Sequence, residues 1–219
     1  WPRVEIITDV SAEVVNLFRI LQRHPEALLR ELRWRSAMRA AFEQLRDMPV
    51  SMMPDVERAA RFLYLQRLAF GGRVRGRTFG VDPTQPHNFD IGRLEPRLNR
   101  LHARLAGVVI ENLDWSDFLA AYDRPGTLFY LDPPYWGSED DYGKALFPPA
   151  DFARRAAALQ VINGRFLLSI NDAPEVRDVF AWADMEAVEV TYTIAKGDAG
   201  AFGELLVGRG VDLSAVGRQ

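Results

Sequence analysis

The chain has 219 residues, 48% of them hydrophobic and 26% charged, which is typical of a soluble globular protein with one sizeable core and a smaller lobe. Cysteine is absent, which excludes disulfides, thiolate catalysis and cysteine-ligated zinc. His24, His87 and His102 lack the spacing of metal ligands, so we expect no metal site. No run approaches the roughly 20 apolar residues of a membrane helix and no signal peptide is visible, so we expect a cytoplasmic protein.

The first half of the chain predicts one strand followed by helices. Apolar residues recur there with the 3.6-residue period of a helix, and prolines or glycines interrupt the pattern. The predicted elements are a strand at 4–8 and helices at 12–21, 25–32, 37–46, 56–70 and 94–105. The Gly-, Pro- and Arg-rich stretch 71–89 predicts a loop.

In the second half, short apolar runs alternate with helical patterns. The predicted strands are 108–110, 127–131, 165–170, 187–192 and 204–207, and the predicted helices between them are 116–122, 150–162 and 174–181. Strands that alternate with helices indicate an α/β protein with a mostly parallel, doubly wound sheet. The last two strands have no helix between them and predict an antiparallel terminal hairpin.

These elements predict two parts with different charge. Residues 1–20 and 100–219 carry the sheet, and residues 21–99 form a largely helical insertion. The stretch 57–104 has 10 basic and 4 acidic side chains, whereas 105–219 has 9 basic and 18 acidic ones. Positive charge that is concentrated in one segment is what phosphate binding requires, so the overall pI of about 5.7 does not exclude a nucleic-acid partner.

The tetrapeptide Asp132-Pro133-Pro134-Tyr135 follows the predicted strand 127–131 directly. It therefore lies at the carboxyl end of a strand, where ligands bind in open α/β sheets. A carboxylate that accepts hydrogen bonds from an NH2 group, two prolines that fix the backbone and an aromatic ring that stacks on a base suit methyl transfer to an exocyclic amine. The alternative is a simple turn, in which Asp132 caps and Tyr135 packs.

Six blocks in this order resemble the Dam-type DNA adenine-N6 methyltransferases, which depend on S-adenosylmethionine. The blocks are ITD (7–9) with VVNLFR (14–19), RFLYLQR (61–67), ENLDW (111–115), DPPYW (132–136), SIND (169–172) and GELLV (203–207). The resemblance extends from residue 4 to about residue 208, and six blocks in order are far more specific than any one of them. It implies a Rossmann-like methyltransferase sheet with an inserted helical lobe that binds double-stranded DNA.

The resemblance also implies a mechanism for 132–135. The target adenine is flipped out of the duplex and stacked on Tyr135, with Trp136 as a flanking ring. Asp132 and the backbone carbonyl of Pro133 accept hydrogen bonds from the N6 amine, while Pro134 completes the motif. These contacts aim the nitrogen lone pair at the methyl group, so orientation and electrostatics carry the reaction and no metal is needed.

For the cofactor, the resemblance implies that Asp9 binds the ribose hydroxyls and that Asp114 and Trp115 border the adenine ring. Asp132 is expected to touch the cofactor as well. The alternatives are an N-terminal helix cap for Asp9 and a core position for Trp115.

For DNA, the resemblance implies contacts from a recognition helix and from the loop after it. The expected residues are Tyr64, Gln66, Arg67, Arg73, Arg75 and Arg77. The arginines suit phosphate groups or the O6 and N7 atoms of guanine. The alternative is an ordinary amphipathic helix with arginines on its solvated face. Residues 169–172 are expected to shape the cofactor side of the sheet, although a turn at the end of a strand explains them equally well.

One departure from the family pattern concerns cofactor binding. A Gly-rich loop of the Phe-x-Gly-x-Gly type should precede Asp9, and nothing in the sequence supplies it. We therefore expect either a fragment of a protein of about 260–280 residues or a natural short form with impaired cofactor binding. Two alternatives to the adenine-N6 enzyme follow: a non-catalytic DNA-binding remnant, and a cytosine-N4 methyltransferase, because the cytosine amine presents the same chemical problem.

Overall fold

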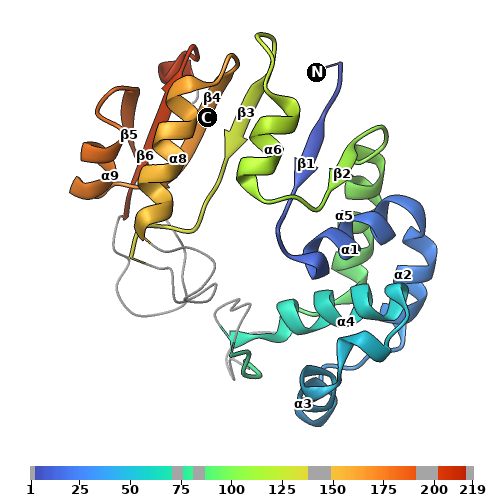
Figure 1. The fold of residues 1–219 in the computed structure, drawn as a ribbon. Helices are drawn as coiled ribbons and strands as arrows, with labels where there is room; N and C mark the ends of the chain where they lie inside the picture. Colours follow the sequence, from blue (N-terminus) through green and yellow to red (C-terminus); the bar gives the residue numbers. More distant parts are fainter. Residues whose placement is uncertain (1–2, 71–75, 81–86, 138–148, 191–201, 216–219) are drawn as a thin grey trace. The chain divides into compact units, whose positions relative to one another are not determined.

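The computed structural model describes residues 3–70, 76–80, 87–137, 149–190 and 202–215 (Figure 1). The chain divides into two compact units, residues 1–115 and 116–219. The predicted insertion 21–99 lies wholly within the first unit, together with the first strand. Arg73 and Arg75 lie outside the described residues.

The first unit is a helical bundle beside a pair of short strands (Figure 1). Its helices are α1 (Ala12–Arg23), α2 (Pro25–Arg33), α3 (Arg39–Asp47), α4 (Asp55–Leu68) and α5 (Ile91–Arg104), with a 3₁₀ turn η1 (Val50–Met52) between α3 and α4. Leucines from α1, α2, α4 and α5 share one core with Phe42 of α3. Pro25 occupies the first turn of α2, where its missing N–H costs nothing, and so marks the break from α1.

The two strands of the first unit run parallel. β1 (Ile6–Thr8) pairs with β2 (Val109–Glu111), with Ile7 opposite Ile110. The chain between them passes through all five helices, so the ends of the two strands are close in space although about a hundred residues separate them. The predicted strand 4–8 begins two residues late, at Ile6.

The second unit contains a four-stranded sheet in the order β3-β4-β6-β5. The strands are β3 (Leu128–Leu131), β4 (Arg165–Asn171), β5 (Asp184–Val190) and β6 (Phe202–Arg209). The helices are α6 (Trp115–Tyr122), α8 (Pro149–Val161) and α9 (Pro174–Val179), and a short 3₁₀ turn η3 (Leu213–Ala215) follows β6. Figure 1 shows α8 crossing one face of this sheet.

The pairing within this sheet is mixed. β3 and β4 are parallel, whereas β6 is antiparallel to both β4 and β5. The antiparallel pairing expected for the last two strands is therefore present, and β6 occupies an interior position between β4 and β5. Leu205 and Val207, two residues apart, lie on one face of β6 and have no exposed surface, and Leu206 on the opposite face is also buried.

The predicted loop after α4 contains a short antiparallel bridge. Ala69 pairs with Phe79, and the amide of Gly80 donates to the Leu68 carbonyl at 2.8 Å. A Cβ atom at Gly80 would lie 2.6 Å from the Phe70 Cα, so only glycine permits this close approach. The helix predicted to reach residue 70 therefore ends at Leu68, where the bridge begins.

Candidate active site and DNA-binding surface

The tetrapeptide 132–135 lies at the carboxyl end of β3, as its sequence predicts. The last register pair of β3 and β4 is Leu131 with Leu168, and Asp132 and Ser169 are the residues that follow in each chain segment. Asp132 is exposed, whereas Pro133, Pro134 and Tyr135 are half-buried. The surrounding protein removes part of the water from the Asp132 carboxyl group, and this desolvation, together with the negative charge of Glu204, raises its pKa.

A hydrogen-bonded carboxylate lies beside the tetrapeptide. Glu204 of β6 accepts hydrogen bonds from the Ser169 hydroxyl and, over a longer 3.5 Å, from the Tyr135 hydroxyl. Ser169 is buried in β4, so its hydroxyl has no ready access to water as an alternative partner. Glu204 therefore connects the middle of the sheet with the aromatic residue that is expected to stack on the base.

The residue after the tetrapeptide is held on two sides. The Asn171 Oδ1 accepts from the Trp136 N–H at 2.7 Å, and the Asn171 Nδ2 donates to the Trp136 carbonyl at 3.1 Å. The Trp136 ring packs edge-on against the buried Phe152 of α8, with ring centroids 4.9 Å apart. Trp136 therefore anchors the loop to α8, and its expected role as a flanking ring for the base stays a prediction.

Asp9 follows β1 and does not cap the next helix. The N-cap of α1 is Ser11, whose hydroxyl accepts from the Val14 N–H at 3.5 Å. Asp9 instead accepts the Ser11 N–H on Oδ1 at 2.7 Å. Partial burial raises the Asp9 pKa, and the hydrogen bond from Ser11 opposes this shift.

Side-chain hydrogen bonds join the end of β1 to the end of β2. The Thr8 hydroxyl donates to the Leu113 carbonyl at 3.0 Å and accepts the Leu113 N–H at 3.1 Å. The Asn112 amide donates to the Asp9 carbonyl at 2.7 Å. Asp114 and Trp115, which come next in the chain and are both half-buried, therefore lie in a segment tied to the one that carries Asp9.

The predicted DNA-binding residues of α4 lie in different surroundings. Tyr64 has no exposed surface, and its hydroxyl donates to the Ser36 carbonyl at 2.8 Å. In this structure Tyr64 packs against the ring of Phe89 and does not reach solvent, so we assign it a role in packing. Gln66 and Arg67 are half-buried, and the Gln66 Oε1 accepts from Arg77 at 3.4 Å.

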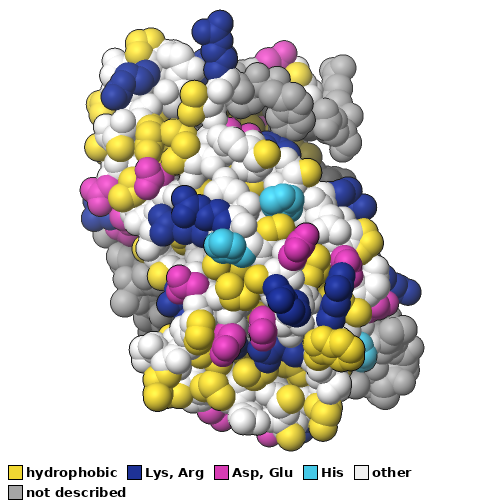
Figure 2. Space-filling view, turned by 90° about the vertical axis from the view of Figure 1, so that its right-hand side faces the viewer, with side chains coloured by type: hydrophobic (Ala, Val, Ile, Leu, Met, Phe, Trp, Pro, Cys, Tyr) yellow, Lys and Arg dark blue, Asp and Glu magenta, His cyan; other side chains and the backbone are white. Residues whose placement is uncertain are grey.

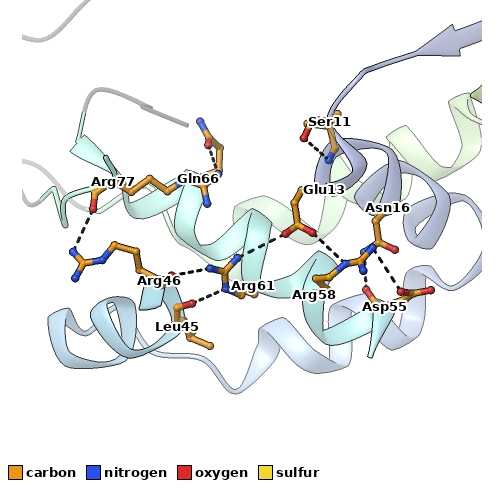
Figure 3. Close-up of polar contacts among 11 residues, drawn as sticks. Ser11, Glu13, Asn16, Leu45, Arg46, Asp55, Arg58, Arg61, Gln66 and Arg77 are labelled. Carbon is orange, nitrogen blue, oxygen red and sulfur yellow. Dashed lines mark hydrogen bonds and ion pairs between the residues drawn. The ribbon is translucent and has the colours of Figure 1, made fainter. Parts of the chain in front are cut away.

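A pocket of about 530 Å³ in the first unit is lined by three arginines, Arg46, Arg61 and Arg77, together with Asp47. Figure 3 shows the polar contacts of the three arginines. Arg61 is buried and donates to the Leu45 carbonyl at 2.5 Å and to the Arg46 carbonyl at 2.9 Å, at the end of α3. Arg46 reaches the Arg77 carbonyl at 3.4 Å. Burial lowers the pKa of Arg77, and the positive charge of Arg61 lowers it further. The carboxylates of Glu13 and Asp47 offset part of this positive charge, since Glu13 lies 3.7 Å from Arg61 and Asp47 pairs with Arg46 at 2.7 Å.

Most of the chain is similar to known proteins. Residues 2–194 match the D12 class N6 adenine-specific DNA methyltransferases. The chain belongs to this family. It is 29% identical over 216 residues to the type II methyltransferase M1.LlaDCHI of Lactococcus lactis subsp. cremoris, covering 88% of this chain and 74% of that protein. It is 21% identical over 178 residues to the type II methyltransferase M.CviBI of Paramecium bursaria Chlorella virus NC1A, covering 80% of this chain and 68% of that protein.

The family confirms the prediction of an adenine-N6 DNA methyltransferase. The cytosine-N4 alternative is wrong, because the family is adenine-specific. A methyl donor of the S-adenosylmethionine type and a DNA substrate follow from the family.

Sequence reasoning missed three residues that the structure places in this methyltransferase's candidate sites: Glu204, Arg46 and Arg61. The signal for Glu204 was its place as an acid within the apolar block 203–207. Asp172, expected on the cofactor side of the sheet, accepts two hydrogen bonds from Arg177 at 2.6 and 2.7 Å.

Charge on the helical part of the methyltransferase is mixed. On the face that Figure 2 shows, basic and acidic side chains are interspersed among apolar ones. Among the described residues, no group of three potential metal ligands comes together. In the same part of the chain, no helix combines the length and hydrophobicity that crossing a membrane requires.

Proposed function

We propose that this methyltransferase acts on an adenine flipped out of double-stranded DNA and transfers to its N6 atom the methyl group of S-adenosylmethionine. The observation that carries the proposal is the tetrapeptide 132–135 at the carboxyl end of β3, with an exposed carboxyl group at its start. Flipping costs a few kcal/mol of stacking and pairing, and stacking on an aromatic ring returns part of that energy.

Each residue of the tetrapeptide has a separate role in this proposal. The Asp132 carboxylate and the Pro133 carbonyl oxygen accept hydrogen bonds from the N6 amine and aim its lone pair at the methyl group. Pro134 restricts the backbone, and the Tyr135 ring stacks on the base. Tyr135 is half-buried, so the residue is not part of the closed core.

The residues after β1 and β2 fit the nucleoside part of the cofactor. Asp9 uses one carboxyl oxygen for the Ser11 N–H, and a carboxylate has further lone pairs for the two ribose hydroxyls. We assign the adenine ring to Asp114 and Trp115, and a further cofactor contact to Asp132. When bound, S-adenosylmethionine supplies an activated methyl group on a positively charged sulfur.

For DNA, we propose contacts from Gln66, Arg67 and Arg77, together with Arg73 and Arg75 of the adjoining loop. The arginine-lined pocket supports this assignment, because Arg77 lies there beside the buried guanidinium of Arg61. A phosphate group would add to the neutralisation that Glu13 and Asp47 give these arginines.

We also propose the arrangement that the family resemblance implies. Residues 1–20 and 100–219 form a doubly wound, Rossmann-like catalytic domain, and residues 21–99 form the inserted lobe that recognises DNA. The two similar proteins named above are type II methyltransferases. By analogy, this enzyme protects its recognition sites in a restriction–modification system.

The test is to incubate the chain with unmethylated genomic DNA and S-adenosylmethionine, digest the DNA to nucleosides and identify the products by mass. We expect N6-methyl-deoxyadenosine from the wild-type chain and none from Asp132→Ala. Production that does not depend on Asp132 would contradict the proposed role of the tetrapeptide.

A further inference from the structure

The tetrapeptide 132–135 has few backbone groups with which to hold its shape. Pro133 and Pro134 have no N–H, so they cannot donate to a neighbouring strand. β3 ends at Leu131, and the next four residues belong to no regular element. Side chains from the adjoining strands must therefore determine where Asp132 and Tyr135 point.

Three polar side chains occupy one face of the sheet beside this loop. Ser169 and Asn171 are two residues apart on β4, and side chains two residues apart lie on the same face of a strand. Glu204 of β6 is the direct register partner of Asn171. Opposite residues in an antiparallel pair have adjacent side chains, and the diagonal neighbour, here Ser169, is also within reach of a long side chain.

Glu204 is oriented by the sheet and contacts the loop. The buried Ser169 hydroxyl donates to one of its carboxyl oxygens, and the Tyr135 hydroxyl donates to the same oxygen. The Tyr135 ring is thus tied at its far end, which restricts rotation of the side chain as a whole. A ring held in one orientation keeps a base stacked on it aligned for the reaction.

Asn171 acts on the other end of the loop. Both polar atoms of its side chain bond to the backbone of Trp136, one as acceptor and one as donor. This closed pair of hydrogen bonds fixes the peptide units immediately after Tyr135. The contact of the Trp136 ring with Phe152 adds a second, apolar anchor at the same residue.

We propose that Glu204 and Asn171 are positioning residues for methyl transfer, the first holding the Tyr135 ring through its hydroxyl and the second holding the loop backbone through Trp136. The proposal rests on the roles proposed above for Asp132 and Tyr135. Neither Glu204 nor Asn171 needs to touch the base or the cofactor. Their loss should slow the chemical step and leave the binding of both substrates intact.

The first experiment measures the single-turnover rate of methylation for Asn171→Ala, with the dissociation constants of DNA and cofactor determined separately. We expect the rate to fall about 100-fold, since a displacement of about 1 Å at a reacting centre has that effect. The dissociation constants should stay at the wild-type values. The matched control is Asn163→Ala, at the opposite end of β4, which removes a hydrogen bond to Asp123 and should leave the rate unchanged.

The second experiment tests Glu204 by conservative replacement and by coupling. Glu204→Gln keeps an acceptor for Tyr135 and should retain more of the rate than Glu204→Ala. Combining Glu204→Ala with Tyr135→Phe should add nothing to the loss, because both changes remove the same contact. Glu186→Gln on β5 is the control for removing an acid from the sheet, and it should keep the wild-type rate.

The fluorescence of 2-aminopurine, placed at the position of the target adenine, gives a further test. A change in protein stability alone would not alter this fluorescence. If the positioning role is correct, Asn171→Ala should change the 2-aminopurine fluorescence of the bound complex. The measurement is made at a temperature at which thermal melting shows that the variant is folded. A wild-type rate for Asn171→Ala, with activity still dependent on Asp132, would overturn the positioning role alone. Activity that does not require Asp132 would instead overturn the proposed function.

Discussion

The side-chain amide of Asn112 donates to the backbone carbonyl oxygens of both Asp9 and Val10, at 2.7 and 3.2 Å. One side chain after β2 therefore holds the segment that follows β1. This segment carries the carboxylate that we assign to the ribose of the cofactor. The position of Asp9 thus depends on a residue outside its own part of the sequence.

Removing this contact should weaken cofactor binding. For Asn112→Ala we expect the affinity for S-adenosylmethionine, measured by calorimetry, to fall about tenfold, which corresponds to ~1.4 kcal/mol and to the loss of one or two hydrogen bonds. Asn99→Ala, on the exposed face of α5, is the matched control. Equal affinities for the two variants would show that the Asn112 contact does not support the cofactor site.

Replacing the carboxylate of the tetrapeptide should abolish turnover and spare DNA binding. Without Asp132 the N6 amine loses its charged acceptor, and the loss of one such oriented group costs about 10²–10³-fold in rate. Asp132→Asn keeps the volume of the side chain and one acceptor oxygen, but it removes the charge and replaces the second oxygen by a donor. Methylation is followed by mass and DNA binding by fluorescence anisotropy, with Asp178→Asn on α9 as the control.

The pH–rate profile should fall on its acidic side, and the pH at which it falls should depend on Glu204. The Asp132 pKa is raised by partial desolvation and by the negative charge of Glu204, so Asp132 takes up a proton at a higher pH than an ordinary aspartate. A protonated Asp132 is a poorer acceptor, and kcat/KM should therefore fall as the pH is lowered through the raised pKa. Glu204→Gln removes the repulsion and should move this fall to lower pH. An unchanged profile would mean that Asp132 does not control it.

Neutralising the arginines should alter the salt dependence of DNA binding. Each phosphate contact contributes about 0.9 to the slope of log K against log salt concentration, because it releases a counterion. Arg77→Gln should reduce the slope by about 1, and adding Arg73→Gln and Arg75→Gln should reduce it further. Arg23→Gln, an equal loss of charge at the end of α1, should leave the slope at its wild-type value.

Arg61 should matter for stability more than any exposed arginine. It satisfies two carbonyl groups at the end of α3, and its guanidinium lies 3.7 Å from a Glu13 carboxyl oxygen. Arg61→Ala would leave these buried groups without their cation, and we expect a loss of ~3 kcal/mol in the free energy of unfolding, measured in urea. Arg93→Ala removes an exposed ion pair with Asp90 and should cost less than ~1 kcal/mol.

The sequence could predict the tetrapeptide 132–135 because its signal is local. An apolar run followed by an acid and two prolines identifies both the strand and its end. The helices of the first unit could also be predicted, because the spacing of their apolar residues and the prolines at their boundaries are local features of the sequence.

The partners of the tetrapeptide could not be predicted, because they depend on strand order. Tyr135 and Glu204 are 69 residues apart, and they meet only because β6 lies between β4 and β5. Periodicity cannot supply that order. Tyr64 shows a second limit: the block that resembles a recognition helix has both a buried and a solvated face, and residue types alone do not say which face an aromatic ring occupies.

The interior place of β6 also has a consequence for how the enzyme is made. β6 is the last strand in the described part of the chain, and a ribosome synthesises it after β3, β4 and β5. Until it inserts, β4 and β5 lack their shared neighbour and Tyr135 lacks Glu204. A chain interrupted before residue 202 would therefore lack both this neighbour and the contact that holds the Tyr135 ring.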